Sequence, residues 1–246
     1  MTPRGLAWVA LATALMVAAP AAAQTFSLDM GEGGGSSTAR IVQLLMLMTV
    51  LSIAPSVLLM VTSFTRIVVV LSFLKHALGT QTSPPNMVMV SLALFLTGFI
   101  MTPTFEASWA QGIRPLMDGE IEELEAFDRA VKPFHAFMTS QVREQDVNFF
   151  TNVARAKPVE KAEETPLKVL IPAFMISELR RAFEIGFLIF LPFLIIDMVI
   201  ASVLMSMGMM MIPPVMIAMP FKLIFFVMVD GWVLVAGSLV QSFGPQ

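Results

Sequence analysis

The sequence predicts an all-α protein built from apolar, membrane-type helical hairpins, with a small extracytoplasmic helical lobe. Its composition is 57% hydrophobic and 13% charged, with a mean hydropathy of +0.80. The apolar residues also gather in four long blocks, at 41–64, 86–105, 185–211 and 215–240. Each block approaches the ~20 residues that a helix needs to cross the hydrocarbon core of a bilayer. The segment 106–184 between the second and third blocks is polar.

The first residues have the pattern of a secretory signal peptide over 1–23. Arg4 gives a positive start, an apolar run follows, and small residues ending at Ala23 precede the expected cleavage before Gln24. An uncleaved first membrane helix is the alternative. Residues 24–40 are rich in Gly and Ser and predict a flexible tether with little capacity to pack.

Charge placement predicts a topology for the two hairpins. With the amino terminus outside the cytoplasm, residues 41–105 form the first apolar hairpin. The short link within it carries basic and no acidic side chains, namely Arg66, Lys75 and His76. This bias is typical of a cytoplasmic loop. The polar segment 106–184 would then lie outside, and 185–243 would form the second apolar hairpin.

The polar segment predicts helices of its own. The stretch "DGEIEELEAFDRAVK" is acidic at its start and apolar at helical spacing, which favours a helix. Pro133 is expected to break that helix or to open a new one. Phe137 and Phe150 either form the core of the lobe or dock onto neighbouring subunits, because a lobe this small buries little surface.

Three charged residues fall within the last two apolar blocks. Asp197 lies 16 residues before Pro213, Asp230 lies 17 after it, and Lys222 lies only nine after it. At ~1.5 Å per residue, Lys222 is expected to be too far along the axis to neutralise either acid within its own hairpin. It would then pair across a subunit boundary or face a water-filled lumen. An ion-coupled transporter or proton channel using these three residues is the alternative function, since ionisable groups at membrane depth are commonly functional.

Enzyme chemistry has little support in the sequence. There is no cysteine, the two histidines lie far apart, and "GEGGGSS" lacks the lysine of a phosphate-binding loop. Asp197 and Asp230 stand in no intramembrane protease motif. A net charge of −3 gives no indication of nucleic-acid binding. We therefore expect no catalytic residue, no metal site and no cofactor.

The stretch "MSMGMMMIPP", residues 205–214, concentrates methionine immediately before a forced turn. Gly208 is expected to loosen the helix, and Pro213 and Pro214 to turn it. The tip between them holds three consecutive methionines, Met209, Met210 and Met211. Methionine adapts to many shapes, so it is favoured where a surface repacks against changing partners. The alternative is a simple apolar helix end.

Three segments together are highly specific. They are "FTRIVVVLSFLKHALGTQTSPPN" (64–86), "REQDVNFF" (143–150) and "PAFMISELRRAFEIGFLIFLPFLIIDMVIASVLMSMGMMMIPPVMIAMPFKLIFFVMVDGW" (172–232). In order and spacing, residues 41–243 resemble the FliP/SctR family of type III secretion export-gate proteins. The signal peptide favours the flagellar branch of that family.

The resemblance implies an assembly that spacing alone does not. Such chains form a homopentamer that joins FliQ and FliR in a helical, cone-shaped gate, and they work with FlhA and FlhB of the export apparatus. The gate belongs to the flagellar basal body and lies in the inner membrane, largely on its periplasmic side, so four true spans would mislead for the finished complex. Unfolded rod, hook and filament subunits pass through it, driven by the proton motive force and an associated ATPase.

The resemblance also implies roles for particular residues. The pore gasket would be Met209, Met210 and Met211. Contacts between copies would involve Phe137, Phe150 and Glu178. The charges at packed subunit boundaries would be Asp197, Lys222, Asp230 and Arg66. The function implied is a non-enzymatic export-gate subunit, with a purely structural assembly scaffold as a further alternative.

Overall fold

The fold is all-α over the residues that the computed structural model describes, 36–80, 83–155, 164–209 and 213–244. The helices are α2 (Ser36–Met60), α3 (Phe64–Ala77), α4 (Asn86–Ser108), α5 (Arg114–Met117), α6 (Glu123–Gln141), α7 (Glu144–Val153), α8 (Leu167–Ser206), α9 (Pro214–Met228) and α10 (Gly231–Gln241). A π-helical segment, η1 (Trp109–Ile113), joins α4 to α5. The predicted signal peptide, with Ala23 and Gln24, lies outside the described residues.

Several helices are long and apolar enough to cross a membrane. The continuous helical run Asn86–Met117 and α8 each meet this condition alone. Leu44–Met60 with α3, and α9 with α10, meet it as bent pairs, with bends of 66° and 64°. The described residues therefore offer two candidate spans, or four if each bent pair is one span. The four apolar blocks of the sequence correspond to these elements.

The chain divides into two compact units, with the boundary after Val50 in α2. In the first unit α2 begins at Ser36, so the last five residues of the predicted tether, 36–40, are helical. The apolar side chains of α2 that follow are exposed, among them Leu45, Met46 and Met48. This part of the chain thus presents an apolar helix surface.

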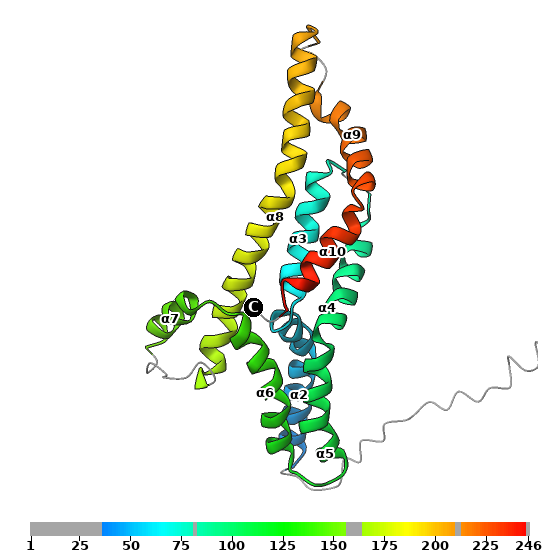
Figure 1. Ribbon diagram of the computed structural model, residues 1–246. Coiled ribbons are helices and arrows are strands. Elements are labelled where there is room, and N and C mark those ends of the chain that lie inside the picture. Colours follow the sequence, from blue (N-terminus) through cyan, green and yellow to red (C-terminus); the bar gives the residue numbers. More distant parts are fainter. Residues whose placement is uncertain (1–35, 81–82, 156–163, 210–212, 245–246) are drawn as a thin grey trace, which may run out of the picture. The chain divides into compact units, whose positions relative to one another are not determined.

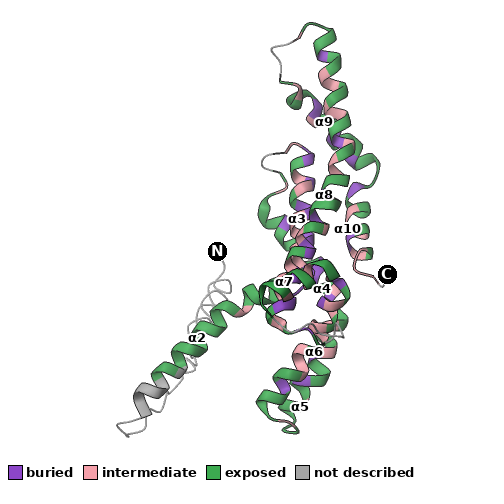
Figure 2. Ribbon diagram, turned by 90° about the vertical axis from the view of Figure 1, so that its left-hand side faces the viewer, coloured by how far each residue is buried: buried purple, intermediate pink, exposed green. Residues whose placement is uncertain are grey.

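In the second unit the core forms around α3, which packs against both α8 and α4 (Figure 1). Ile67, Val70, Leu71 and Leu74 repeat at helical spacing and are all fully buried. Figure 2 shows buried residues gathered on α3 and on the helix faces around it. The expectation that this segment is a loop is therefore wrong, whereas the side of the membrane on which it lies stays a prediction. The basic residues suggested a loop, although the apolar residues of the same segment repeat at helical spacing, which indicates a packed helix.

Prolines inside α6 and α8 do not end these helices. Pro133 lies inside α6, which runs unbroken from Glu123 to Gln141. Pro172 and Pro192 lie inside α8, which begins at Leu167 and so passes through the expected boundary at 184/185. An internal proline removes one backbone hydrogen bond. The remaining bonds, and packing against neighbouring helices, keep these helices continuous.

A close helix contact ties α6 to the end of α4. The Ser108 hydroxyl donates a hydrogen bond of 2.8 Å to the carbonyl of Ala130. A Cβ added at Gly112 in η1 would lie 2.7 Å from the Ala130 Cβ and from the Ala126 carbonyl oxygen. Glycine is therefore what allows the two backbones to approach so closely.

Gly112→Ala is expected to destabilise the chain by about 1–3 kcal/mol, because the added methyl forces α6 away from η1. Gly98→Ala, in α4, is the matched control, since a Cβ there meets no atom within 4 Å. That change should be neutral or stabilising, because alanine is the better helix former. Thermal unfolding of the purified chain in detergent measures both. Equal midpoints for the two variants would contradict the close contact.

Candidate functional site: the α8–α9 hairpin and its buried ion pairs

The second half of α8 and the antiparallel α9 form a hairpin, called here the α8–α9 hairpin, which extends past the end of α3 (Figure 1). At its tip α8 ends in a Schellman motif: the Gly208 N–H bonds the Met205 carbonyl at 3.1 Å, and the Met209 N–H bonds the Leu204 carbonyl at 3.0 Å. Gly208 has φ +76°, the left-handed conformation that this motif requires. Gly208 therefore terminates α8 rather than loosening it.

The other side of the tip is set by the two prolines. Pro214 is the first residue of α9 and Pro213 caps it. Proline is well suited to this first position, because its missing N–H would have no helical partner there. Met209 is half-buried, whereas Met210 and Met211 lie outside the described residues. Their described neighbours are exposed methionines, Met205, Met207 and Met216, at 60–67% exposure.

An ion pair joins the two helices of the hairpin. The Lys222 Nζ lies 2.6 Å from Asp197 Oδ2 and also donates to the Ala77 carbonyl at 3.1 Å. Lys222 is 3% exposed and Asp197 is 27% exposed. The prediction that Lys222 lies too far along the axis to neutralise Asp197 within its own hairpin is wrong.

The physical reason is the span of the turn. The predicted positions along the hairpin assumed that both helices continue to Pro213. In the structure α8 ends at Ser206 and α9 begins at Pro214. Counted from the helix ends, Asp197 lies nine residues back and Lys222 eight residues in, so the two are level. The bond to Ala77 further attaches the hairpin to the end of α3.

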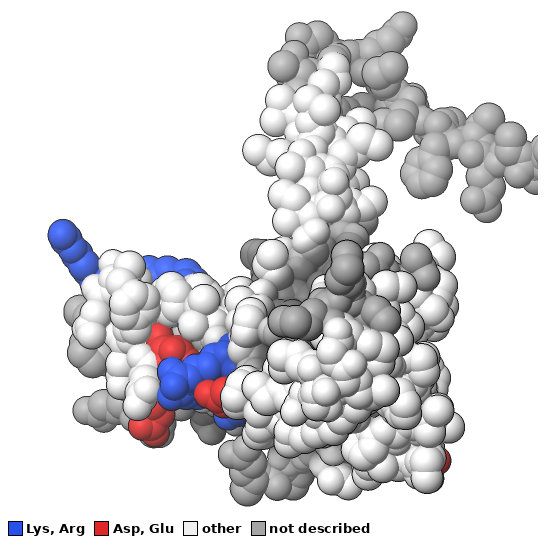
Figure 3. Space-filling view, turned by 90° about the horizontal axis from the view of Figure 1, so that it is seen from above, with Lys and Arg blue, Asp and Glu red and all other residues white. Residues whose placement is uncertain are grey.

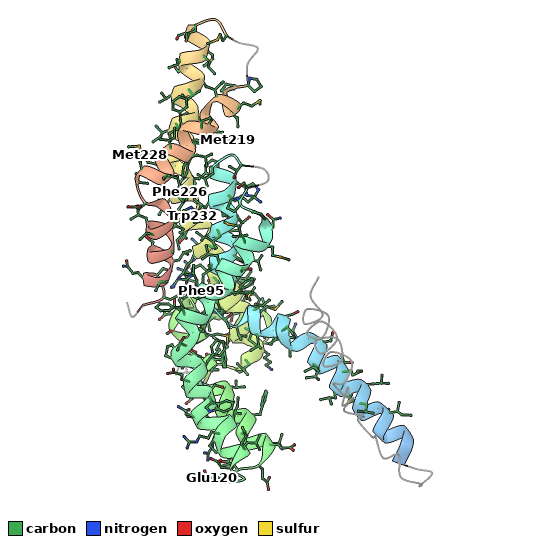
Figure 4. The ribbon with its side chains drawn as sticks, turned by 90° about the vertical axis from the view of Figure 1, so that its right-hand side faces the viewer. Phe95, Glu120, Met219, Phe226, Met228 and Trp232 are labelled. Atoms are coloured by element: carbon green, nitrogen blue, oxygen red, sulfur yellow. The ribbon has the colours of Figure 1, made fainter. Side chains whose placement is uncertain are left out.

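Asp230 does not lie deep within a helix as expected. It sits at the break between α9 and α10, with φ 52°, and it is exposed on this chain. Its carbonyl accepts the first hydrogen bonds of α10, from Val233 and Leu234. Figure 4 shows Phe226 and Trp232 close together at this bend, with ring centroids 5.2 Å apart. The position of Asp230 at a subunit boundary stays a prediction.

A second ion pair lies in the core beneath the hairpin. Arg66 on α3 and Glu178 on α8 are 1% and 0% exposed. Arg66 Nε donates to Glu178 Oε2 at 2.9 Å, and Arg66 Nη2 donates to Glu178 Oε1. Such a two-point contact is the geometry in which arginine recognises a carboxylate best.

The remaining donors of Arg66 are also satisfied. Nη2 reaches Gln141 of α6 at 3.2 Å, and Nη1 reaches the carbonyl and hydroxyl oxygens of Ser242, both at 3.0 Å. The guanidinium carbon lies 3.6 Å from the centroid of the Phe243 ring, a cation–π arrangement. Arg66 thus connects α3, α6, α8 and the residues after α10. We call this set the Arg66 hub: Arg66, Gln141, Glu178, Ser242 and Phe243.

Both charges were predicted as site residues, but their pairing was not predicted. Arg66 is the one charge in the apolar stretch "FTRIVVV", and an isolated charge in an apolar helix requires a partner. That signal could have suggested that Arg66 is paired, although not that its partner is Glu178, 112 residues away. Glu178 uses both of its carboxylate oxygens inside this chain. Its contact with a neighbouring copy stays a prediction.

The two predicted phenylalanine contacts have different surroundings. Phe137 is half-buried and packs against Phe174 and Phe243, at centroid distances of 6.0 and 6.1 Å. Phe150 packs against Phe149 on α7, a helix with no buried residue. Within the chain, Phe137 therefore contributes to a small core, whereas Phe150 is half-buried on α7, which packs against α8.

Charged side chains are unevenly distributed. Figure 3 shows them gathered over the side that carries α7 and the start of α8, while most of the rest of that face is uncharged. Among the described residues, no group of three or more His, Asp or Glu side chains lies close enough to hold a metal ion. His135 Nε2 lies 2.8 Å from the Thr165 carbonyl oxygen, and His76 Nδ1 lies 2.7 Å from that of Ser72.

Comparison with known proteins decides the family. The model of the FliP family matches residues 47–239, which include the core, the Arg66 hub up to Glu178 and the whole α8–α9 hairpin. The chain belongs to the FliP family. The resemblance of the three sequence segments to this family is thereby confirmed.

Curated relatives match this chain over most of their own length. The flagellar biosynthetic protein FliP of Caulobacter vibrioides is 59% identical over 95% of this chain and 88% of its own. The FliP proteins of Bacillus subtilis and Aquifex aeolicus are 55% and 47% identical, over 82% and 88% of this chain and 91% and 90% of their own. Membership of the FliP family implies a role in flagellar export for a protein with membrane-spanning helices.

Proposed function

We propose that this chain is the pore-forming subunit of the flagellar type III protein export gate. Five copies, together with FliQ and FliR, would surround a path through which unfolded flagellar subunits leave the cell, next to FlhA and FlhB. The gate would lie in the inner membrane within the basal body, largely on the periplasmic side. The chain would supply walls and a seal rather than catalysis.

The observation that carries this proposal is the tip of the α8–α9 hairpin. Flexible apolar side chains are exposed on both sides of it, at Met205, Met207 and Met216, and they flank the run Met209, Met210 and Met211. A monomer in water would not leave such a tip uncovered. In a ring of copies the tips would meet on the axis, where thioether side chains can close around polypeptides of differing shape.

The ion pair between Lys222 and Asp197 favours a gate over an ion-coupled channel. The Lys222 ammonium has two acceptors inside the chain, Asp197 and the Ala77 carbonyl, and so is held as a fixed link between helices. Asp230 is the third residue of the channel hypothesis. It lies at the break between α9 and α10 and takes no part in the ion pair. A structural role explains Lys222 and Asp197 without a proton path.

Changing the three tip methionines to glutamine is the test of the seal. Glutamine is similar in length to methionine but polar, so Met209→Gln, Met210→Gln and Met211→Gln together should raise leakage of protons and small solutes. Met198→Gln is the control, because Met198 is exposed on α8 outside the tip. Leakage is measured in cells with a pH-sensitive reporter, alongside the yield of assembled complex on native gels. Assembly at normal yield with unchanged leakage would exclude the gasket and leave a scaffold role.

A further inference from the structure

A pocket of about 660 Å³ lies between the end of α3 and the start of α4, away from the hairpin tip. One part of its lining is polar, with Lys75, Thr80 and Asn86, and another part is apolar, with Val68 and Val90. Its volume falls in the range of small-molecule sites. Neither the Arg66 hub nor the proposed seal uses these residues.

The polar part of this pocket offers hydrogen-bond donors. Lys75 Nζ donates to Asn86 Oδ1 at 2.6 Å, and an ammonium group has further N–H donors available. The Thr80 hydroxyl oxygen is buried and has no hydrogen-bond partner among the described residues. His76 Nδ1 lies 2.7 Å from the Ser72 carbonyl oxygen, which can only accept, so the imidazole donates at that nitrogen.

The surroundings contain little to compensate that charge. Among the described residues no acid lines the pocket, and the sequence has none between Glu32 and Glu106. The acid brought to the end of α3 by Lys222 is Asp197, which that lysine already neutralises. A pocket whose described lining has a cation, a buried unpartnered hydroxyl and no carboxylate is suited to an anion.

The pocket also lies where candidate membrane spans end. α3 completes one bent span at Ala77, and Asn86, which lines the pocket, begins the next. From there Val90 and Leu94, one turn apart on α4, are both exposed and apolar. A donor-lined pocket at the end of two spans, continuous with an apolar helix face, matches a ligand with a charged head and a hydrocarbon tail.

We propose that this pocket binds the phosphate of an anionic phospholipid. Lys75 and Thr80 donate to the phosphate oxygens, and an acyl chain lies along Val90 and Leu94. Basic pockets between membrane helices are known to bind anionic lipid headgroups. The proposal stands independently of the export-gate function, because it concerns only the α3–α4 end of one chain.

The test is competitive binding to the full-length chain, delipidated in detergent. Equal amounts of phosphatidylglycerol and phosphatidylcholine are added, and the lipid bound to the intact protein is counted by native mass spectrometry. Both lipids carry a phosphate, but phosphatidylcholine also brings a quaternary ammonium close to Lys75, where the described lining offers no acid to compensate it. Phosphatidylglycerol should therefore be preferred by about tenfold, and Lys75→Gln should abolish the preference. Thr80→Val, which removes a donor to the phosphate and leaves the charge unchanged, should weaken the binding of both lipids and keep the preference.

Lys168→Gln is the matched control, because it removes the same charge from an exposed lysine at the start of α8. This variant should keep the preference. Equal binding of the two lipids by the unmodified chain, or equal loss in both lysine variants, would overturn the pocket assignment. A further arm adds soluble sn-glycerol 3-phosphate. Displacement of phosphatidylglycerol at equimolar concentration would assign the site to a free phosphate ester and overturn the lipid. Circular dichroism confirms that each variant keeps its helix content.

Discussion

Arg66→Met is expected to cost about 3–5 kcal/mol of folding free energy, the typical loss when one partner of a buried ion pair is removed. Glu178 would keep a fully buried carboxylate without the guanidinium that bonds both of its oxygens, and only the charge of the nearby Arg181 would remain to offset it. Gln141 and Ser242 would lose their bonds to the guanidinium as well. The loss should appear as a lower midpoint of thermal unfolding, followed by tryptophan fluorescence of the purified chain.

Helix α8, which carries Glu178, offers a matched control. Arg180 and Glu184 form an exposed pair at 3.1 Å, four residues apart on α8. Exposed pairs contribute about 0–1 kcal/mol, so Arg180→Met should lower the midpoint only slightly. The double change Arg66→Met with Glu178→Met should recover much of the loss, because an apolar pair can replace a buried ion pair. An Arg66→Met midpoint no lower than that of Arg180→Met would refute the role of the hub.

Much of the helical content could be predicted from the sequence, because long apolar blocks are its strongest signal. The blocks at 86–105 and 185–211 correspond to α4 and to the second half of α8. The break at Asp230 inside the last block was missed. A left-handed non-glycine residue leaves little trace in composition or period.

The core around α3 was missed for a different reason. Its basic residues suggested a loop, yet Arg66 is buried because Glu178 neutralises it from α8. A single sequence cannot reveal that partner, since the two residues lie 112 positions apart. Pairwise contacts between distant segments depend on tertiary packing, which propensity and period do not encode.

At the hairpin tip, the position of the turn could be predicted from the sequence, but its length could not. Gly208 and the two prolines correctly mark where the chain turns, because each has a specific backbone requirement. The length of the turn, however, decides which residues face each other across the hairpin. An error of seven residues in that length moved Lys222 away from Asp197 in the prediction.

That correction changes what Lys222→Met should do. If Lys222 paired only across a subunit boundary, the isolated chain would be unaffected and only the complex would weaken. Because its partners Asp197 and Ala77 lie in the same chain, the isolated chain itself should be destabilised. We expect about 2 kcal/mol, less than for Arg66, because Asp197 is partly exposed and water screens its charge.

The measurement compares the unfolding midpoints of isolated Lys222→Met and Lys168→Met chains, the second removing an exposed lysine from the same protein. Only the first should shift downward. Asp197→Leu added to Lys222→Met should restore part of the loss, because it removes the carboxylate that would otherwise stay partly buried without a cation. Hydrogen exchange in α9 should rise in the single variant, since the link to α3 is lost. Identical midpoints for the two lysine variants would mean that the Lys222–Asp197 pair contributes nothing to the stability of the isolated chain. Pairing of Lys222 across a subunit boundary would then be the better explanation.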